Sequence, residues 1–197
     1  MPIRLLIGLG NPGERYRQTR HNAGFVVLER LNEFRRTRWR SGCGGRWAEA
    51  EIRGCPVVLF EPQSYMNLSG EPVVRMLGRG YAPGEILVIC DDMDLPLGRV
   101  RLKPAGGSGG HRGLASIARE LGTNEFPRLR VGIGRPGENV DARDYVLQSF
   151  GAEERDLADL TLDLAVRAVI CAVASGIEEA MNAFNGVTVR PEGAEDE

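Results

Sequence analysis

The fold is decided by one stretch near the start of the chain, Gly8-Leu9-Gly10-Asn11-Pro12-Gly13-Glu14-Arg15-Tyr16-Arg17-Gln18-Thr19-Arg20-His21-Asn22-Ala23-Gly24. It follows a short apolar run, residues 3–9, that is typical of a buried first strand. The turn Asn11-Pro12-Gly13 then interrupts the chain, because proline fixes one φ angle and glycine permits a positive one. A helical pattern begins only after His21 and Asn22. Open α/β sheets bind ligands at polar loops that leave the carboxyl ends of strands, so we expect a site here.

Strands and helices alternate along the rest of the chain. The hydrophobic patterns predict strands at about 3–9, 47–52, 57–60, 86–90, 100–103 and 129–133, helices at about 23–38, 72–78, 114–121, 142–148, 152–174 and 177–184, and loops at 41–45 and 61–70. This order predicts an α/β fold: a single domain with a mixed, mostly parallel twisted sheet flanked by helices on both faces. We expect this domain to span residues 1–190. Residues 191–197 carry four acids and no cation, so we expect an acidic, disordered tail.

Composition excludes several classes of protein. No apolar run approaches the roughly 20 residues that span a membrane, and the N-terminus lacks a signal-peptide pattern, so we expect a cytoplasmic protein without a membrane partner. Four cysteines without a C-x-x-C pair and two histidines predict no metal cluster. The net charge of −2 does not by itself indicate a nucleic-acid binder.

Two glycine-rich motifs resemble sites of other enzymes but lack the required context. The first, Gly8 to Gly13, matches the dinucleotide motif G-x-G-x-x-G, yet Pro12 and a polar loop delay the helix by roughly ten residues. The second, Gly106 to Gly110, matches G-x-S-x-G, but the run before it is charged, and the only later histidine is His111. A nicotinamide-dependent oxidoreductase and a serine hydrolase are therefore both disfavoured.

With these enzyme classes disfavoured, the remaining interpretation of the polar residues is acid–base catalysis. Asn11, His21, Asn67, Asp91 and His111 follow or flank predicted strand ends, and parallel strands bring such ends to one edge of the sheet. A neutral imidazole, with an unperturbed pKa of about 6.5, accepts protons near pH 7. A carboxylate on its other nitrogen would fix the tautomer, and oriented carboxamides would stabilise developing charge. The set indicates hydrolysis of an acyl bond by water, with His21 as base and Asp91 as its partner.

Each of these residues also has an ordinary structural interpretation. Asn11 precedes Pro-Gly and could serve only the turn, and Asn67 or Ser69 could cap the next helix. Asp91 could belong to a solvated strand end. His111 could cap its helix, and Met66 could fill the core.

Several motifs together resemble one family. The opening stretch, with Gly-Leu-Gly-Asn-Pro-Gly, Tyr16 and Thr19 to Gly24, is similar to the start of bacterial-type peptidyl-tRNA hydrolases. The resemblance continues through the segments 65–70, 91–96, 106–113, 128–137 and 180–185. It covers nearly the whole chain, in order and at consistent spacing.

The resemblance implies a metal-free, monomeric enzyme without cofactor or obligate protein partner. It would hydrolyse the ester between a peptide and the 3′-terminal ribose of tRNA, releasing free tRNA for reuse in translation. His21 would be the general base, oriented by Asp91, with Asn11 and Asn67 positioning peptide carbonyls and the intermediate. The other residues implied to bind the 3′-CCA end, the peptide or the acceptor-stem phosphates are Tyr16, Tyr65, Met66, His111, Lys103 and Arg130.

One departure from the family pattern concerns Arg112, which stands where the family usually has asparagine after the histidine. An arginine cannot accept a hydrogen bond. We expect Arg112 to bind tRNA phosphate instead. The alternative is a catalytically lapsed RNA-binding relative on the same fold, and the presence of Asn11, His21, Asn67 and Asp91 argues against it.

Overall fold

The computed structural model describes residues 1–35 and 37–191. Its strands form one twisted sheet of seven in the order β2-β3-β4-β1-β5-β7-β6. The strands are β1 (Leu5–Gly8), β2 (Arg40–Gly42), β3 (Gly45–Ile52), β4 (Cys55–Pro62), β5 (Ile86–Asp92), β6 (Val100–Lys103) and β7 (Arg128–Gly132). The four central strands β4, β1, β5 and β7 are parallel, whereas the outer strands pair antiparallel. The predicted mixed, mostly parallel sheet is confirmed.

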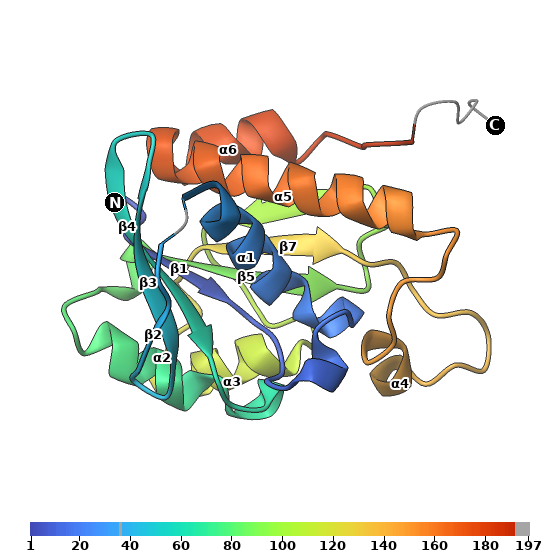
Figure 1. The fold of residues 1–197 in the computed structure, drawn as a ribbon, viewed down its shortest axis with the longest axis horizontal. Helices are drawn as coiled ribbons and strands as arrows, with labels where there is room; N and C mark the ends of the chain where they lie inside the picture. The colour runs from blue at the N-terminus through green and yellow to red at the C-terminus, as the bar shows by residue number, and fades with distance from the viewer. Residues whose placement is uncertain (36, 192–197) are drawn as a thin grey trace.

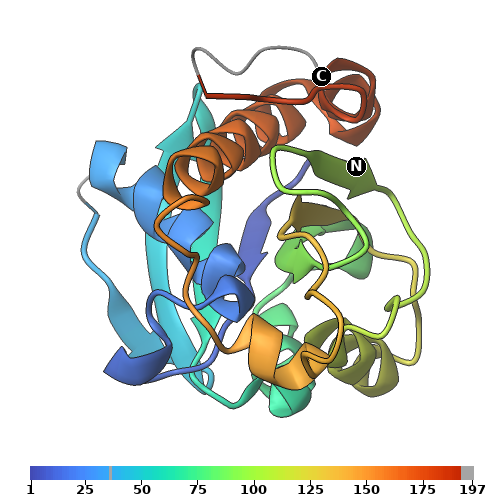
Figure 2. The same cartoon turned by 90° about the vertical axis from the view of Figure 1, so that its right-hand side faces the viewer.

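Helices cover both faces of this sheet (Figures 1 and 2). One face carries α1 (Ala23–Arg35), α5 (Arg155–Ser175) and α6 (Ile177–Phe184), and the other carries α2 (Gly70–Leu77) and α3 (Arg112–Leu121). Each layer of helices buries its own apolar cluster against the sheet. The short helix α4 (Ala142–Val146) lies beyond the end of the sheet (Figure 1). Within the described part of the chain, no helix has both the length and the apolar character needed to cross a membrane.

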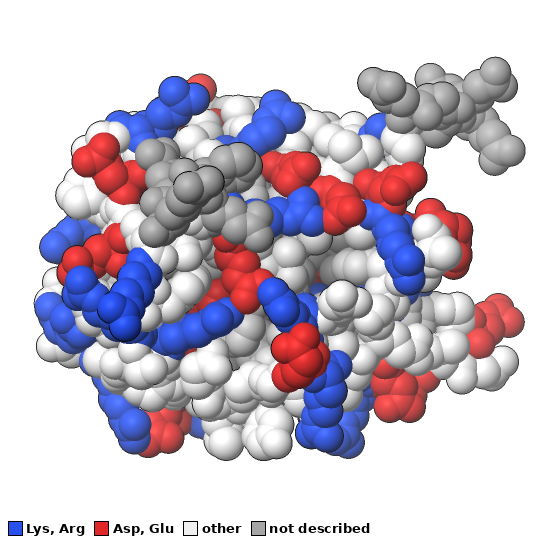
Figure 3. Space-filling view, viewed as in Figure 1, with Lys and Arg blue, Asp and Glu red and all other residues white. Residues whose placement is uncertain are grey.

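Charge is distributed without a dominant sign on the face that α1 and α5 form. Cationic and anionic side chains alternate over these two helices (Figure 3). Arg30 of α1, for example, pairs with Asp159 and Asp163 of α5. On the described part of this face, cationic and anionic side chains are mixed and do not gather into one basic surface.

Three predicted boundaries were wrong. Residues 41–45 do not form a loop: β2 and β3 make a hairpin, because Cys43 and Gly44 both adopt positive φ, as a two-residue turn requires. The first helix ends at Arg35 rather than near residue 38. The 61–70 segment is strand to Pro62 and then a short 3₁₀ turn, Met66–Leu68. Residue 36 and the predicted acidic tail, apart from its first residue, lie outside the described residues.

A close contact between backbones holds the opening stretch over the sheet. Leu9 donates its N–H to the Ile89 carbonyl at 2.9 Å, which extends the pairing of β1 and β5. Gly24 then packs directly on this junction. A Cβ on Gly24 would lie 2.3 Å from the Ile89 oxygen and 2.4 Å from the Leu9 nitrogen, so only glycine fits. This contact seats the turn that carries His21 against the end of β5.

Candidate active site

A cavity of about 560 Å³ opens at the carboxyl ends of the parallel strands. The strand order explains its place, because β1, β5 and β7 deliver their following loops to the same edge. Ten of the eleven residues predicted for the site line this cavity; they are Asn11, Tyr16, His21, Tyr65, Met66, Asn67, Asp91, His111, Arg112 and Arg130.

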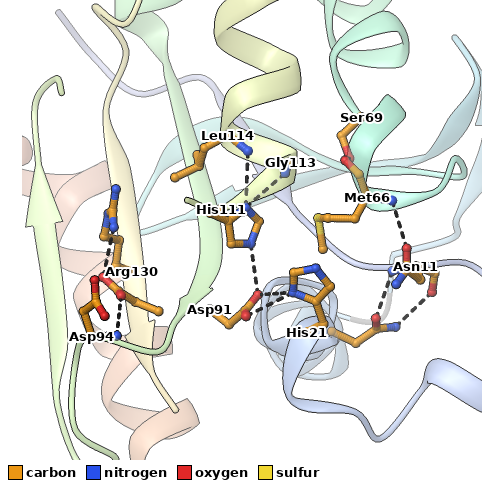
Figure 4. Close-up of polar contacts among 12 residues, drawn as sticks. Asn11, His21, Met66, Ser69, Asp91, Asp94, His111, Gly113, Leu114 and Arg130 are labelled. Carbon is orange, nitrogen blue, oxygen red and sulfur yellow. Dashed lines mark hydrogen bonds and ion pairs between the residues drawn. The ribbon is translucent and has the colours of Figure 1, made fainter. Parts of the chain in front are cut away.

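His21 and Asp91, which both line this cavity, form a bifurcated contact (Figure 4). Nδ1 of His21 lies 2.9 Å from one carboxylate oxygen of Asp91 and 3.0 Å from the other. Asp91 is 3% exposed, so it is not a solvated strand end. Burial alone would raise the pKa of Asp91, but the charges and hydrogen bonds of His21 and His111 outweigh it and hold that pKa well below its usual range. The carboxylate is therefore ionised at neutral pH, and Nδ1 of His21 carries the proton.

His111 is the second imidazole on the same carboxylate. Its Nε2 lies 3.0 Å from Oδ1 of Asp91. Its Nδ1 accepts hydrogen bonds from the backbone N–H groups of Gly113 and Leu114, both at 3.2 Å, so it caps α3 as well as facing the site. Because Nδ1 is an acceptor, the proton must sit on Nε2, which donates to Asp91. This shared contact with Asp91 has no signal in the sequence.

A polar clamp fixes Asn11. Asn22 accepts the Asn11 N–H at 2.9 Å and donates its own amide to the Asn11 carbonyl at 3.0 Å. The side-chain oxygen of Asn11 in turn accepts the N–H of Met66 at 2.8 Å. This bond commits the oxygen, so the amide nitrogen of Asn11 is the atom oriented to donate to a ligand in the cavity. Asn22, which follows His21 directly, is a supporting residue that sequence reasoning did not single out.

The three cationic residues predicted to bind tRNA differ in how far they are exposed and paired. Arg130 is 9% exposed and donates to Asp92 at 3.0 Å and to the carbonyl of Gly107 at 2.9 Å. Arg112 is exposed at the first position of α3 and lines the cavity. Lys103 is exposed but does not line the cavity; it pairs in register with Arg128 at the far end of β6.

The segment 65–67 also contributes to the cavity lining. Met66 is buried and also lines the cavity, so it serves core and site together. Tyr65 is 54% exposed, and Asn67 is also exposed and lines the cavity. Ser69 precedes α2 without a side-chain cap; its hydroxyl donates to the Met66 carbonyl at 2.8 Å. Neither Asn67 nor Ser69 is explained as a helix cap.

His21, Asp91 and His111 are also the group of described residues that could hold a metal ion. Their potential ligand atoms lie within 4.8 Å of one another. In the structure these atoms hydrogen-bond to one another. A cation there would have to displace the Nδ1 proton of His21 and the Nε2 proton of His111.

Comparison with known proteins gives a consistent result. The family model described as peptidyl-tRNA hydrolase matches residues 5–192. A peptidyl-tRNA hydrolase of Desulforudis audaxviator is 48% identical over 186 residues, covering 93% of each chain, and one of Fervidobacterium nodosum is 44% identical, covering 94% of this chain and 97% of that one. The crystal structure of peptidyl-tRNA hydrolase from Acinetobacter baumannii superposes with a TM-score of 0.88 at 39% identity, covering 94% of this chain and 96% of that one.

Proposed function

The chain belongs to the peptidyl-tRNA hydrolase family, and from this premise we propose how its residues hydrolyse the ester between peptide and tRNA. His21 is the general base. Its Nδ1–H is held by Asp91, which leaves Nε2 unprotonated and free to take a proton from water. The water oxygen attacks the ester carbonyl, and the imidazolium then returns the proton to the departing ribose oxygen. The products are a peptide carboxylic acid and a free tRNA hydroxyl.

The carboxamide of Asn11 stabilises the negative charge that develops on the carbonyl oxygen, whereas that of Asn67 binds substrate. The best-supported donor is the amide nitrogen of Asn11, because the Met66 N–H and the Asn22 clamp fix its orientation in advance. A preorganised donor of this kind contributes about 3–4 kcal/mol in comparable sites. Asn67 is exposed and is less constrained, so we assign it to the peptide carbonyl next to the reacting ester. Tyr16, Tyr65 and Met66 line the peptide side of the cavity.

Phosphate binding falls mainly to Arg112. Arg130 already donates to Asp92 and Gly107, so a phosphate would have to compete with the Asp92 carboxylate. Arg112 is exposed at the cavity rim, and Lys103 lies farther along β6, where the acceptor stem could extend. Backbone contacts of this kind position tRNA without reading its sequence. His111 serves the site through Asp91 and the start of α3.

The observation that carries the proposal is the contact between the buried Asp91 carboxylate and Nδ1 of His21. It is tested by measuring release of free tRNA from N-acetyl-aminoacyl-tRNA. We expect His21→Ala to lower kcat by at least 10²–10⁴-fold. Asn67→Ala, at an exposed position, should act mainly on KM. A folded His21→Ala variant with near wild-type kcat would contradict the base assignment. A wild-type protein that binds tRNA without cleaving it would indicate a lapsed RNA-binding relative.

Arg112 has its own test. We expect Arg112→Ala to raise KM and to reduce the slope of log kcat/KM against log salt by about 0.7–0.9, the loss of one phosphate contact. Arg119 is the matched control, since it is exposed near the other end of α3 and pairs with Glu120. Arg119→Ala should leave both quantities unchanged. An unchanged salt slope in Arg112→Ala would exclude the phosphate contact.

The remaining proposals concern context. Because peptidyl-tRNA arises in translation, we propose that the enzyme acts in the cytoplasm. We also propose that it acts as a monomer, since one chain supplies all the residues assigned above. A molar mass near 21.5 kDa in sedimentation would agree with this.

A further inference from the structure

Arg20 precedes His21 in the 3₁₀ turn Arg20–Asn22 and is 5% exposed. Its guanidinium carbon lies 4.2 Å from the centroid of the Tyr145 ring and 5.0 Å from that of Phe150. A buried permanent charge is costly unless it is paired and hydrogen-bonded. Such a residue, directly before the proposed base, indicates a defined structural role.

The Arg20 side chain hydrogen-bonds to residues 148–154 and also interacts with the Tyr145 side chain. Nη1 donates to the carbonyls of Gln148 at 3.3 Å and Ser149 at 2.8 Å, and Nη2 donates to Glu154 at 2.5 Å. The same Glu154 oxygen accepts the N–H of Gly151 at 2.7 Å. The Arg20 backbone N–H adds a bond to Gln148 at 3.0 Å. Arg20 therefore clamps this segment from both its backbone and its side chain.

The clamped segment continues a wall of the catalytic cavity. Four residues of α4 and its end, Ala142, Arg143, Val146 and Leu147, line the cavity. Their apolar support is a small cluster around Ile133, Tyr145 and Val146, which is separate from the two main cores. Segments with few buried apolar contacts have low local stability. The position of this wall consequently depends on its polar attachments, and Arg20 supplies most of those described.

We propose that Arg20 is a positioning residue that holds the wall formed by residues 142–150 against the turn that carries His21. The same residue thus joins the surface that receives substrate to the backbone next to the base. Loss of the clamp lets the wall move away, which weakens substrate binding more than it slows the chemical step. This inference adds a role for Arg20 and does not depend on which residues contact phosphate.

The test compares Arg20→Gln, Arg20→Lys and Glu154→Gln with Arg30→Gln. Arg30 is the matched control, because it also pairs with two acids and a backbone carbonyl, but between α1 and α5, away from the cavity. For Arg20→Gln we expect KM for N-acetyl-aminoacyl-tRNA to rise at least tenfold while kcat falls less than fivefold. Arg20→Lys keeps the charge but loses the two-nitrogen donor geometry of the guanidinium. Its KM should therefore lie between that of the wild type and that of Arg20→Gln. Arg30→Gln should lower Tm without changing KM.

Hydrogen exchange measures the wall directly. In Arg20→Gln, amides of residues 142–150 should exchange at least tenfold faster than in the wild type, while exchange in the sheet stays unchanged. Glu154→Gln is less disruptive, so it should speed exchange of the same amides by a smaller factor. Three results would overturn the proposal: a KM within twofold of that of Arg30→Gln, a loss confined to kcat, or faster exchange spread evenly over the sheet. The last would mean that Arg20 serves only global stability.

Discussion

Replacing Asp91 by asparagine should remove the proposed base through a change of tautomer. His111 cannot accept a hydrogen bond from the new amide, because its Nδ1 is committed to Gly113 and Leu114. The Nε2–H of His111 therefore donates to the amide oxygen of the substituted side chain, and the amide NH₂ is directed toward His21. Nδ1 of His21 then faces the amide oxygen at 2.9 Å and the amide NH₂ at 3.0 Å, and the NH₂ favours the tautomer in which Nδ1 accepts and Nε2 carries the proton. In that tautomer the nitrogen that should receive the proton from water is blocked.

The magnitude follows from the charge that the carboxylate offers to the imidazolium. With about 4 Å between the centres of the two delocalised charges and an effective dielectric constant of about 20, their attraction is about 4 kcal/mol. Each 1.36 kcal/mol corresponds to a factor of ten in rate. We therefore expect Asp91→Asn to lower kcat about 10³-fold at pH 7.5, with KM changed less than threefold. The comparable substitution in serine proteases costs about 10⁴.

The assay is single-turnover cleavage of N-acetyl-aminoacyl-tRNA, with Tm measured for each variant. The double variant Asp91→Asn/His111→Ala makes the test sharper. Without His111 the amide can flip, offer its oxygen to His21 and restore the productive tautomer. The double variant should be about tenfold faster than Asp91→Asn. A loss below tenfold in the single variant would refute the role of the carboxylate, and a double variant slower than the single one would refute the role of His111.

Two further predictions concern buried polar groups outside the set that reacts with substrate. Asn22→Ala removes the side chain that pairs with the buried backbone N–H and carbonyl of Asn11. The free energy of unfolding in urea should therefore fall by about 2–4 kcal/mol, and kcat should fall at least tenfold. A wild-type kcat in this variant would mean that the Asn22 side chain does not orient Asn11. Burial, only partly offset by Arg46, raises the pKa of Glu61 from 4.5 to about 7. A raised carboxyl pKa favours the folded state below pH 4.5, and this contribution is lost as the pH rises through 7. Between pH 5 and 8, urea unfolding should show the wild type losing up to about 3 kcal/mol relative to Glu61→Gln, and parallel pH curves for the two proteins would contradict this.

The sequence was informative about the fold because chain order and strand direction are linked. Apolar runs alternating with helical patterns imply right-handed crossovers and parallel strands, and these bring Asn11 and Asp91 to one edge. The same reasoning failed at residues 41–45. Gly-rich composition there indicated a loop, whereas Cys43 and Gly44 form only the turn of a hairpin whose strands continue on both sides.

The sequence predicts which residues belong to the site but not which of them hydrogen-bond to one another. A polar residue at a strand end is visible in the sequence, and His21 and Asp91 were found in this way. A shared partner is a property of three-dimensional distance, and 20 residues separate Asp91 from His111. From the sequence alone, a helix cap and a site residue are alternative interpretations of His111. The structure joins them, because the nitrogen that caps α3 determines which nitrogen faces Asp91. The helix cap thereby fixes the tautomer of His111, whose Nε2–H donates to the same carboxylate that holds Nδ1–H of His21.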